Sequence, residues 1–552
     1  MQMYVISAEK PLPLHRKMKK MQTQRLIHTA VLLFLVLTCQ ASESVKPDSV
    51  WYDSITGMRT HLQRVDTIMP HTCALHFFGK KPDGTAKLPG LQALIEDVSI
   101  NGLVLSYDYF VQDRVWARVS RHVIEDNLTG GWVWDNDSFS GNQFAHPFHG
   151  SMFYNAARQH GLSYGVSLLY PVAGSLTWEL FCETNRPAYN DLLSTGIGGS
   201  AFGEVTHRIS DIFFDDSKRG GGRVLREIVG TLLNPVRGVH RMMSGEMFRV
   251  NRLNAGKKEA PMPYTFQIGV GDRYIYDLGP VHPRIGERYY KHVPFIDFRF
   301  NYGDHFNHID DDKPARAYDY FTFYALVNLA SRQPTVGELD ICGRIGSIQQ
   351  EHSHGWKLDL GLYQNVKYVD HYSKRGEDPG NLAMISEAVS FGGGLYAQHE
   401  GKRTTLSHSL MLSAVPLGGS AADYYPFRRY NYGTGASLRY RFEYTLNRHL
   451  TVGNDFYFMR LFIIKGETPQ KLAIYTSNEH RYWKEVEDGI DAWGDKGEHS
   501  ILQNRAFVHF NLCPGLQLRL QHEFHLRHGN YRYYPSITGK NHEFYMGINY
   551  AL

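Results

Sequence analysis

The stretch 132–210 concentrates polar side chains of the types that acid–base and nucleophilic chemistry uses. Four of them are the predicted catalytic residues, namely Asp137, His146, Glu179 and Asp191. A histidine acts as a general base near neutral pH when a carboxylate holds its ring in place. We therefore predict that His146 is the base and that Asp137 or Glu179 orients it.

Other polar residues of the same stretch have the chemistry of ligand binding. The amides of Asn142 and Asn190 can donate hydrogen bonds to an oxyanion or a phosphate. Glu204 and His207 stand three residues apart, so on a helix they share a face, where such a pair binds a metal or relays a proton. Arg208 completes the predicted ligand-binding residues. The sequence singles out no definite metal site, and the cofactor, if there is one, is unknown.

The same residues also fit a structural interpretation. A helical segment in or beneath a barrel needs polar side chains, and Asp137, His146 and Glu179 would then form buried ion pairs and hydrogen bonds. The chain has no Gly-x-Ser-x-Gly nucleophile elbow, and the pair Gly174-Ser175 is too short to count as one. Both interpretations stay open at this point, so whether the protein is an enzyme is uncertain.

Helices are expected to position these residues. Apolar and small residues recur at helical spacing over 148–156, and a second apolar segment covers 168–181. The segment 223–243 has the pattern of a basic amphipathic helix, and Pro235 predicts a kink or break near Asn234. The stretch 132–210 is therefore predicted to lie in a helical domain.

From about residue 262 onward, apolar residues alternate with polar ones. Leu358 and Leu360, for example, alternate with Lys357 and Asp359. The pattern recurs to the end of the chain with no helix signal between the segments, which favours an antiparallel transmembrane β-barrel over a soluble sandwich. About twelve strands are predicted, near 264–274, 292–303, 319–330, 337–350, 354–368, 386–397, 404–415, 433–445, 450–464, 500–511, 515–527 and 541–552.

The connections between these strands alternate loosely between short and long. The long ones are rich in Asp, Gly, Lys and Tyr and are predicted to be extracellular loops, with the short ones as periplasmic turns. The last segment carries alternating apolar residues up to Leu552, which is typical of the signal that barrel-insertion machinery reads, although an aromatic terminal residue is more usual. The predicted extracellular loops are 304–318, 369–385, 416–432 and 465–499.

Composition supports a barrel and argues against other classes. Aromatic residues make up 13% of the 552 residues, which suits aromatic girdles at two membrane interfaces. The formal net charge of +4 is small for this length and gives no indication of nucleic-acid binding. The five cysteines form no Cys-x-x-Cys pair, so zinc-ribbon and thioredoxin-like readings are weak.

The N-terminus has the features of an export signal. Basic residues precede the short apolar run 30–37, and small residues follow it up to Ser42. We predict a signal peptide over 1–41, with a lipoprotein cleavage before Cys39 as the alternative, and a start at Met18 instead of Met1 is also open. Between this signal and the helical domain, 42–100 is predicted to be irregular and 103–111 to be strand-like.

The polar stretch resembles a known family. The motifs that carry the likeness are Trp132-x-Trp134-Asp135-x-Asp137, His146-Pro147, Asn190-Asp191 and Leu233-Asn234-Pro235-x-Arg237-Gly238. They are similar to a family of bacterial outer-membrane proteins known as domain of unknown function 3943, over roughly 100–250. The resemblance implies an outer-membrane location and a barrel but no reaction. The residues before Asn190, Ala188-Tyr189, depart from the small polar residue expected there.

A weaker resemblance concerns the order of the polar residues. Asp137 and His146 near one helix, Glu179 in the next, and then Asn190-Asp191 are similar in order to VanZ-like membrane proteins. That likeness implies a small helical bundle that gathers these side chains. It is an analogy of fold and carries no reaction of its own.

Together these observations predict four parts: a signal peptide (1–41), an irregular segment (42–100), a polar and aromatic helical domain (101–261) and an outer-membrane barrel (262–552). The helical domain is expected to fill the lumen or cap its periplasmic mouth in a Gram-negative envelope. The leading function is action on envelope lipid or cell wall, as a hydrolase or transferase. The alternatives are a plugged channel for small solutes and a structural protein. Outer-membrane lipid and the insertion machinery are the predicted partners, no nucleic acid is expected, and the oligomeric state is unknown.

Overall fold

The structure is a computed structural model that describes residues 88–248, 250, 262–277, 290–306, 316–330, 333–375, 378–477 and 491–551. The predicted signal peptide and the part of the irregular segment before residue 88 lie outside the described residues.

Twelve antiparallel strands form a closed barrel, as the sequence predicts. Each strand pairs with its neighbour in the chain, and β1 closes the barrel against β12, with Gln267 opposite Ala551. The strands are β1 (Tyr264–Asp277), β2 (Tyr290–Tyr302), β3 (Phe321–Asn328), β4 (Val336–His352), β5 (Trp356–Arg375), β6 (Asp378–Glu400), β7 (Thr404–Ala421), β8 (Tyr430–Leu446), β9 (Leu450–Ile463), β10 (Gly497–Cys513), β11 (Leu516–Tyr531) and β12 (Ile537–Ala551).

The two faces of the barrel wall differ as the period of two requires. Side chains from strands that are not neighbours meet inside: Arg505 on β10 lies 2.8 Å from Glu338 on β4, and the hydroxyl of Tyr545 on β12 lies 3.2 Å from the same carboxylate. On the outer face, Leu362 and Met546 are more than half exposed. A polar interior inside an apolar outer band is the arrangement of a membrane barrel.

The order of the strands fixes which connections share an end. We call the end where β1 begins and β12 stops the terminal end, and the opposite one the far end. Residues 303–306 and 316–320 and the segments 353–355, 401–403, 447–449 and 514–515 lie at the terminal end. Residues 422–429, 464–477 and 491–496 lie at the far end.

The predicted long extracellular loops need correction in two respects, namely the end of the barrel at which they lie and how much of them belongs to strands. The described residues of 304–318 lie at the terminal end, whereas those of 465–499 lie at the far end, so the two connections cannot both be extracellular. Loop length misled the assignment, because the direction of the preceding strand, not the length, decides the side. The segments 369–385 and 416–432 lie largely within strands: β5 and β6 continue through most of the first, and β7 and β8 through much of the second. Bulges interrupt the alternation there, for example near His371 and between Val415 and Gly418.

Residues before the barrel form a helical domain, which we define as 88–248. Its helices are α2 (Pro89–Phe110), α3 (Arg121–Thr129), α4 (His146–Gln159), α5 (Tyr164–Ser167), α6 (Leu169–Phe181), α7 (Tyr189–Leu193), α8 (Gly199–Phe213), α9 (Gly220–Leu233) and α10 (Pro235–Met243). Short π-helical segments lead into α4 and α8, and α11 (Pro469–Ser477) belongs to the far end of the barrel. Within the part of the chain that the structure describes, no helix is long and apolar enough to cross a membrane.

One local prediction is confirmed and two are wrong. The predicted break falls where expected, because α9 ends at Leu233 and α10 begins at Pro235. The strand expected over 103–111 is instead the second half of α2, and 88–100 is not irregular, since nearly all of it is the first half of the same helix. Apolar residues occur on much of the surface of α2, so apolar and polar residues happen to alternate over 103–111 although this stretch is helical.

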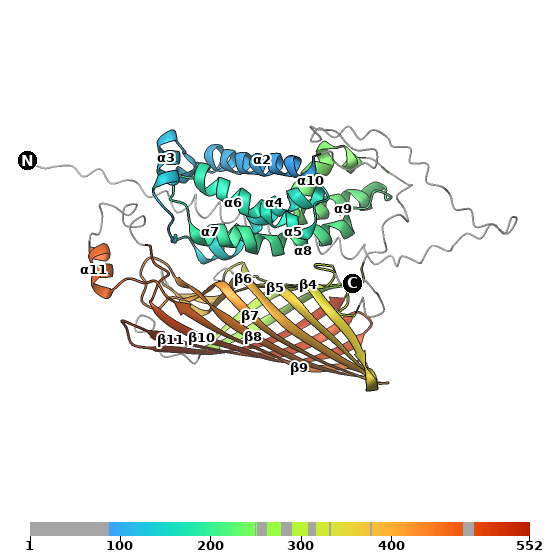
Figure 1. Ribbon diagram of the computed structural model, residues 1–552. Helices are drawn as coiled ribbons and strands as arrows, with labels where there is room; N and C mark the ends of the chain where they lie inside the picture. Colours follow the sequence, from blue (N-terminus) through green and yellow to red (C-terminus); the bar gives the residue numbers. More distant parts are fainter. Residues whose placement is uncertain are drawn as a thin grey trace, which may run out of the picture.

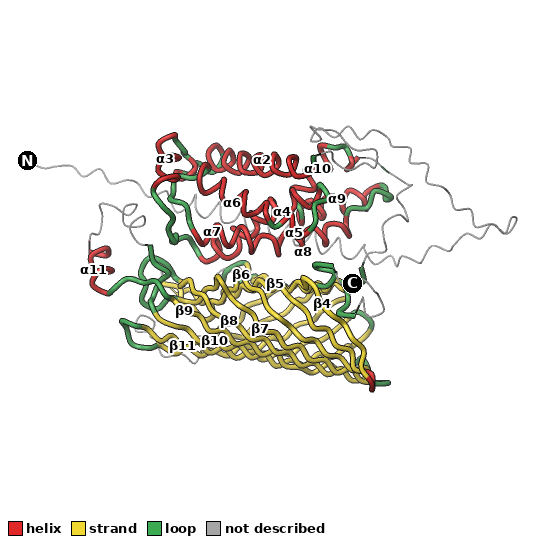
Figure 2. The backbone as a smooth tube through the Cα atoms, viewed as in Figure 1, coloured by secondary structure: helices red, strands yellow, loops and turns green. Residues whose placement is uncertain are grey.

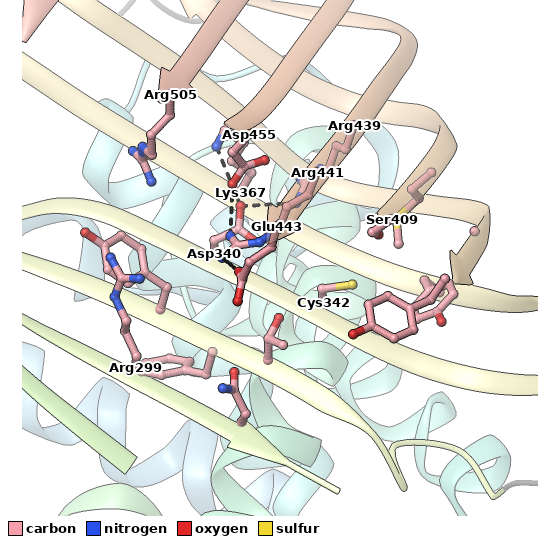
Figure 3. A pocket seen from close by; sticks show the side chains of 18 of the residues that line it. Arg299, Asp340, Cys342, Lys367, Ser409, Arg439, Arg441, Glu443, Asp455 and Arg505 are labelled. Atoms are coloured by element: carbon pink, nitrogen blue, oxygen red, sulfur yellow. Dashed lines mark hydrogen bonds and ion pairs between the residues drawn. The ribbon is translucent and has the colours of Figure 1, made fainter. Parts of the chain in front are cut away.

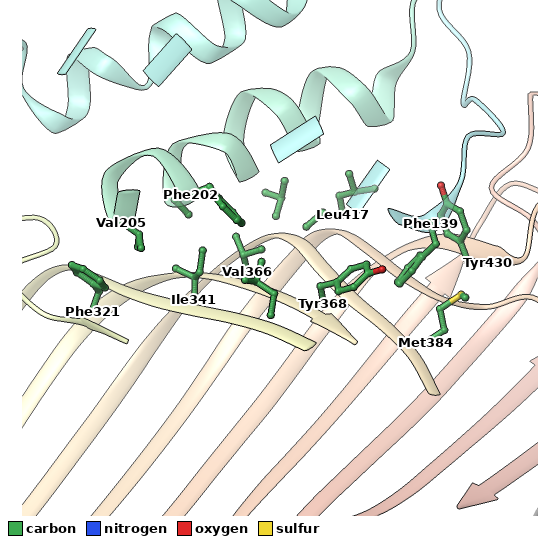
Figure 4. Packing of buried hydrophobic residues seen from close by; sticks show 14 of the residues in the cluster. Phe139, Phe202, Val205, Phe321, Ile341, Val366, Tyr368, Met384, Leu417 and Tyr430 are labelled. Atoms are coloured by element: carbon green, nitrogen blue, oxygen red, sulfur yellow. The ribbon is translucent and has the colours of Figure 1, made fainter. Parts of the chain in front are cut away.

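The helical domain lies beside the barrel, against the outer face of its wall. The prediction that it fills the lumen or caps the periplasmic mouth is therefore wrong. Figure 1 and Figure 2 show the helices α2 to α10 gathered along one side of the strands. On β4, Glu338 points into the lumen whereas its neighbour Leu339 packs in a hydrophobic cluster with the helix residues Phe202 and Val205. Figure 4 shows Phe202 and Val205 between the helices and the near strands, with Ile341 among the strand residues of the same cluster.

The polarity of the helical domain is inverted. On α2, Glu96, Asp97 and Asn101 are buried, while Leu94 and Val98 are exposed. The same reversal occurs on α6 and α9, where Glu179 and Glu227 are buried and apolar side chains face outward. Soluble domains bury their apolar face instead. The exposed apolar residues of these two helices are Leu169, Val172, Leu176, Phe181, Val224, Ile228 and Leu232.

Candidate functional site

Two of the four predicted catalytic residues meet directly. His146 is the first residue of α4, and Asp191 lies in the short helix α7. Nε2 of His146 lies 3.3 Å from Oδ1 of Asp191, and its Nδ1 lies 3.4 Å from Oγ1 of Thr195. An acid, an imidazole and a hydroxyl thus stand in series, which is the order of groups in an activated nucleophile.

Close packing of two helical segments makes this series possible. A Cβ atom on Gly150 of α4 would lie 1.9 Å from the carbonyl oxygen of Thr195, and one on Gly199 would lie 2.6 Å from Cα of Gly150. A larger residue at either glycine would therefore push the segment that carries Thr195 away from α4. Since His146 stands four residues before Gly150 on α4, such a shift would separate the imidazole from the hydroxyl.

Asp135 forms the second part of the site. Its Oδ1 accepts hydrogen bonds from the amides of Asn142 and Asn190, both at 2.8 Å, and from the hydroxyl of Tyr432 at 2.9 Å. The amide of Asn190 also donates to Oδ1 of Asp191 at 2.7 Å. The two asparagines predicted to bind a ligand therefore hold the two aspartates in place.

The barrel contributes directly to this site. Besides Tyr432 on β8, the hydroxyl of Tyr430 accepts a hydrogen bond from the amide of Asn142 at 2.7 Å. Arg428, in the far-end connection before β8, donates to the carbonyl oxygen of Asp135. The backbone nitrogen of Trp134 donates to Asp491 at 3.1 Å, which belongs to the next far-end connection. The site thus lies beside the far end of the barrel wall.

The other two predicted catalytic residues surround this core. Glu179 on α6 is buried, and its carboxylate accepts the backbone N–H of Ala188 at 2.8 Å. Burial raises the pKa of Glu179 to about 8, and the charges of Asp135 and Asp137 add to that rise. Asp137 is exposed and acts on Glu179 through its charge. Together with Glu183 and Asp191, these residues form what we call the acidic cluster.

Burial sets the protonation of the central pair. It raises the pKa of Asp191 well above its usual range, with the charges of Asp135 and Glu179 adding to the effect. Burial lowers the pKa of His146, which keeps its imidazole neutral near pH 7. A neutral imidazole can accept a proton, so His146 is suited to the role of a base.

The other predicted ligand-binding residues belong to a different group. Oε1 of Glu204 accepts from Arg208 at 2.8 Å, and Oε2 accepts from Arg158 at 2.7 Å and from the hydroxyl of Tyr154 at 2.8 Å. His207, on the same helix, is neutral near pH 7, because burial and the charge of Arg237 lower its pKa to about 4. This group ties α8 to α4 and has the geometry of a buried ion-pair network.

The barrel lumen holds a separate charged region. A cavity of about 630 Å³ is lined by charged and polar side chains and by some apolar ones such as Phe323 and Met411 (Figure 3). Asp340 accepts from Arg439 at 3.1 Å there, and Arg441 donates to Glu443 at 2.9 Å. Beside the cavity, side chains of β1, β4, β5, β10, β11 and β12 contact one another inside the lumen. We call them the lumen network: Arg273, Glu338, His371, Arg505, Glu523, His525, Glu543 and Tyr545.

Sequence reasoning missed three parts of the site. Asp135 stands in one of the family motifs and Thr195 lies within the polar stretch 132–210, but the sequence assigns a role to neither. Only the fold brings Thr195 to His146. Tyr432 lies on a strand, and the sequence pattern predicts that a tyrosine on the outer face of a barrel strand is a membrane-interface residue and not part of a site. The density of Asp, Asn and His over 132–210 was the one signal that located the region.

One family model matches part of the helical domain. The model of a family described as "Domain of unknown function (DUF3943)" matches residues 131–236. The matched segment includes the series Thr195, His146 and Asp191. The comparisons give no support to the VanZ-like resemblance. No curated protein matches the chain.

Several solved porin and channel structures are similar to about half of the chain. The NanC porin is 9% identical and is covered over 98% of its length by 51% of this chain, with a TM-score of 0.23. An anion-selective porin from Comamonas acidovorans is 8% identical, with 99% and 52% covered and a TM-score of 0.20. The toluene transporter TodX of P. putida is 10% identical, with 90% and 53% covered and a TM-score of 0.20. Likeness at this level carries no argument about function.

Proposed function

We propose that this chain is an outer-membrane protein whose helical domain hydrolyses or transfers acyl groups of envelope lipid, with the barrel as its anchor. One observation carries the proposal: the series Asp191, His146 and Thr195 lies in a domain whose outer surface is apolar. A site that acts on lipid needs both a nucleophile and access from a hydrocarbon phase. Export through the predicted signal peptide and insertion by barrel machinery belong to the same proposal.

The placement in the membrane rests on two surfaces. The outer face of the barrel carries the apolar band that a bilayer requires. The helical domain covers part of that band and replaces it with an apolar surface of its own, as Leu94, Val98 and Leu169 illustrate. An exposed apolar surface of this extent on a water-facing domain would be a liability. The helical domain is therefore proposed to contact lipid.

The proposed reaction follows from the series of three groups. Oγ1 of Thr195 attacks the carbonyl carbon of an ester, and its proton passes to Nδ1 of His146 while Asp191 holds the ring. The bond from that carbon to the leaving alcohol breaks, and the alcohol takes the proton from His146. Water, in a hydrolase, or a second hydroxyl group, in a transferase, then displaces Thr195 by the same steps.

Lipid analysis of cells that express single variants tests this proposal. His146→Ala and Thr195→Val should abolish a change in outer-membrane lipid that the natural chain produces, as measured by mass spectrometry. Thr206→Val is the matched control, because Thr206 is a buried threonine that contacts Asn155 instead of His146. Heat-modifiable migration on gels shows whether each variant still folds as a barrel. Folded variants with an unchanged lipid profile would overturn the proposal.

A channel is the second candidate, and the lumen cavity favours it. Its wall carries Arg299, Arg439 and Arg441, which would attract an anionic solute. The lumen network stands across the path, so the natural chain should conduct little in planar bilayers. Replacing Glu338 and Arg505 by alanine should then produce discrete conductance steps. If the double variant conducts no more than the natural chain, the channel candidate fails.

A further inference from the structure

A second group of metal-binding residue types lies in the helical domain, apart from the acidic cluster. Glu96 on α2, His160 at the C-terminal end of α4 and His240 on α10 each offer one ligand atom, and these atoms all lie within 4.8 Å of one another. Oε1 of Glu96 lies 2.8 Å from Nε2 of His160. Three helices that are distant in sequence therefore bring two imidazoles and a carboxylate to one point.

This group is separate from the proposed acyl-transfer site. His146 and His160 mark the two ends of α4, and at 1.5 Å per residue they stand about 20 Å apart along the helix. The residues of the three-helix group have no part in the series formed by Thr195, His146 and Asp191. The three residues can therefore be substituted without changing the proposed acyl-transfer site.

We propose that Glu96, His160 and His240 bind a divalent transition-metal ion such as Zn²⁺. Two histidines and a glutamate form a three-ligand set that zinc uses when a fourth position is left to water, and the same set suits other divalent metals of the first transition row. The proposal does not rest on the acyl-transfer function.

The surroundings of the three residues support a cation there. The side chain of His160 is 1% exposed and that of Glu96 is 11% exposed, so both ligands are shielded from water. The amide of Gln159 donates to the second carboxylate oxygen of Glu96, which would fix the orientation of that ligand.

A bound ion would also explain how the three helices stay together. The helix α4 packs against both α2 and α10. The polar side chains at this junction have an apolar surface around them, as Val239 and Met243 of α10 are exposed. The competing interpretation is a plain Glu96–His160 hydrogen bond with the ring of His240 packed edge-on at 5.7 Å from that of His160. That interpretation needs no ion and predicts no affinity for one.

Metal binding by the purified full chain in detergent tests the proposal. After treatment with a chelator and dialysis, the chain should take up about one equivalent of Zn²⁺, as measured by elemental mass spectrometry. Co²⁺ in its place should give the visible absorption of a nitrogen- and oxygen-coordinated ion. Zn²⁺ should also raise the midpoint temperature of unfolding, because an ion that binds only the folded state stabilises it.

Variants decide which residues hold the ion. Glu96→Gln and His240→Asn should each weaken Zn²⁺ binding about tenfold or more. His122→Asn is the control, because His122 is an exposed histidine on α3 and should leave binding unchanged. No uptake by the natural chain would overturn the proposal, and so would equal uptake by a folded His160→Asn/His240→Asn variant. Lipid activity plays no part in these readouts, so failure here is distinct from failure of the acyl-transfer proposal.

Discussion

The barrel and the helical domain both place apolar side chains outside and polar ones inside, but they treat buried charge differently. In the lumen network, carboxylates face cations: Arg505 lies 2.5 Å from Glu523 and 2.8 Å from Glu338, and Arg273 lies 3.4 Å from Glu543. Positive and negative groups alternate across the lumen there. Buried charges that are paired in this way have a structural explanation that needs no ligand.

The acidic cluster lacks that balance. Five carboxylates lie in or near it, and the groups that hold Asp135 and Asp191 are mainly amides, a hydroxyl and a neutral imidazole. The strongest charges acting on Asp191 are other carboxylates. Uncompensated acids with shifted pKa values are typical of functional sites. The two regions thus differ in how they affect stability. Paired charges in the lumen network stabilise the fold, whereas buried carboxylates without cationic partners in the acidic cluster destabilise it.

The largest expected effect is on activity. Asp191→Asn keeps the shape of the side chain but removes the acid that orients His146. Under the proposed acyl-transfer function, the rate should fall by about three to four orders of magnitude, as when the acid of a comparable triad is replaced by its amide. The loss should appear in the turnover number measured with a short-chain ester in detergent. Equal turnover by natural chain and variant would place Asp191 outside the reaction.

The fold could be predicted much further than the site. The alternation from residue 262 onward predicted all twelve strands, because each barrel strand must place every second side chain in lipid. Pro235 predicted the break between α9 and α10. The strand expected over 103–111 shows where the same logic fails: a helix in an apolar environment has apolar residues on most sides, so short windows of α2 alternate without being a strand.

The site was predicted in part. His146 and Asp191 were selected by residue type, and the structure brings them together. Thr195 and Tyr432 were out of reach, since their roles depend on how α4 packs on the segment 194–198 and on how the domain lies against β8. The side of the barrel on which the helices pack could not be derived either. Helices rich in polar residues fit inside a lumen as well as beside the barrel wall. The two placements differ in whether the outer surface of the helices is apolar, and that surface is known only from the structure.

The next effect concerns the stability of the barrel. Arg505→Met leaves Glu338 and Glu523 buried without their shared cation. Breaking a buried pair in this way should lower the free energy of unfolding by about 3–5 kcal/mol. Urea titration in detergent, followed by gel migration, measures it. Arg460→Met is the control, because that arginine is 43% exposed and pairs at the surface, where less than about 1 kcal/mol is expected. Equal losses in both variants would contradict the balanced-lumen interpretation.

A smaller effect tests the surface of the helical domain. Val98 on α2 is 58% exposed. If that surface contacts lipid, Val98→Lys should lower the free energy of unfolding in lipid vesicles by about 2 kcal/mol, since a lysine in contact with hydrocarbon is costly. Val98→Ala is the matched control, because it removes the same side chain without introducing a charge. A water-facing surface predicts changes within about 0.5 kcal/mol for both variants.

The smallest effect is a pH dependence. The pKa of Glu179 rises from 4.5 to about 8 on burial, so the folded chain holds a proton that the unfolded chain releases between these values. Stability contributed by this group is therefore present below pH 4.5 and is lost as pH rises toward 8. Glu179→Gln should reduce the slope of the unfolding midpoint over that window, measured by tryptophan fluorescence. The exposed Glu125→Gln should leave the slope as it is in the natural chain. If Glu179→Gln leaves it unchanged as well, the carboxyl is ionised in the folded chain, and the contrast between an unbalanced helical site and a balanced lumen loses its main support.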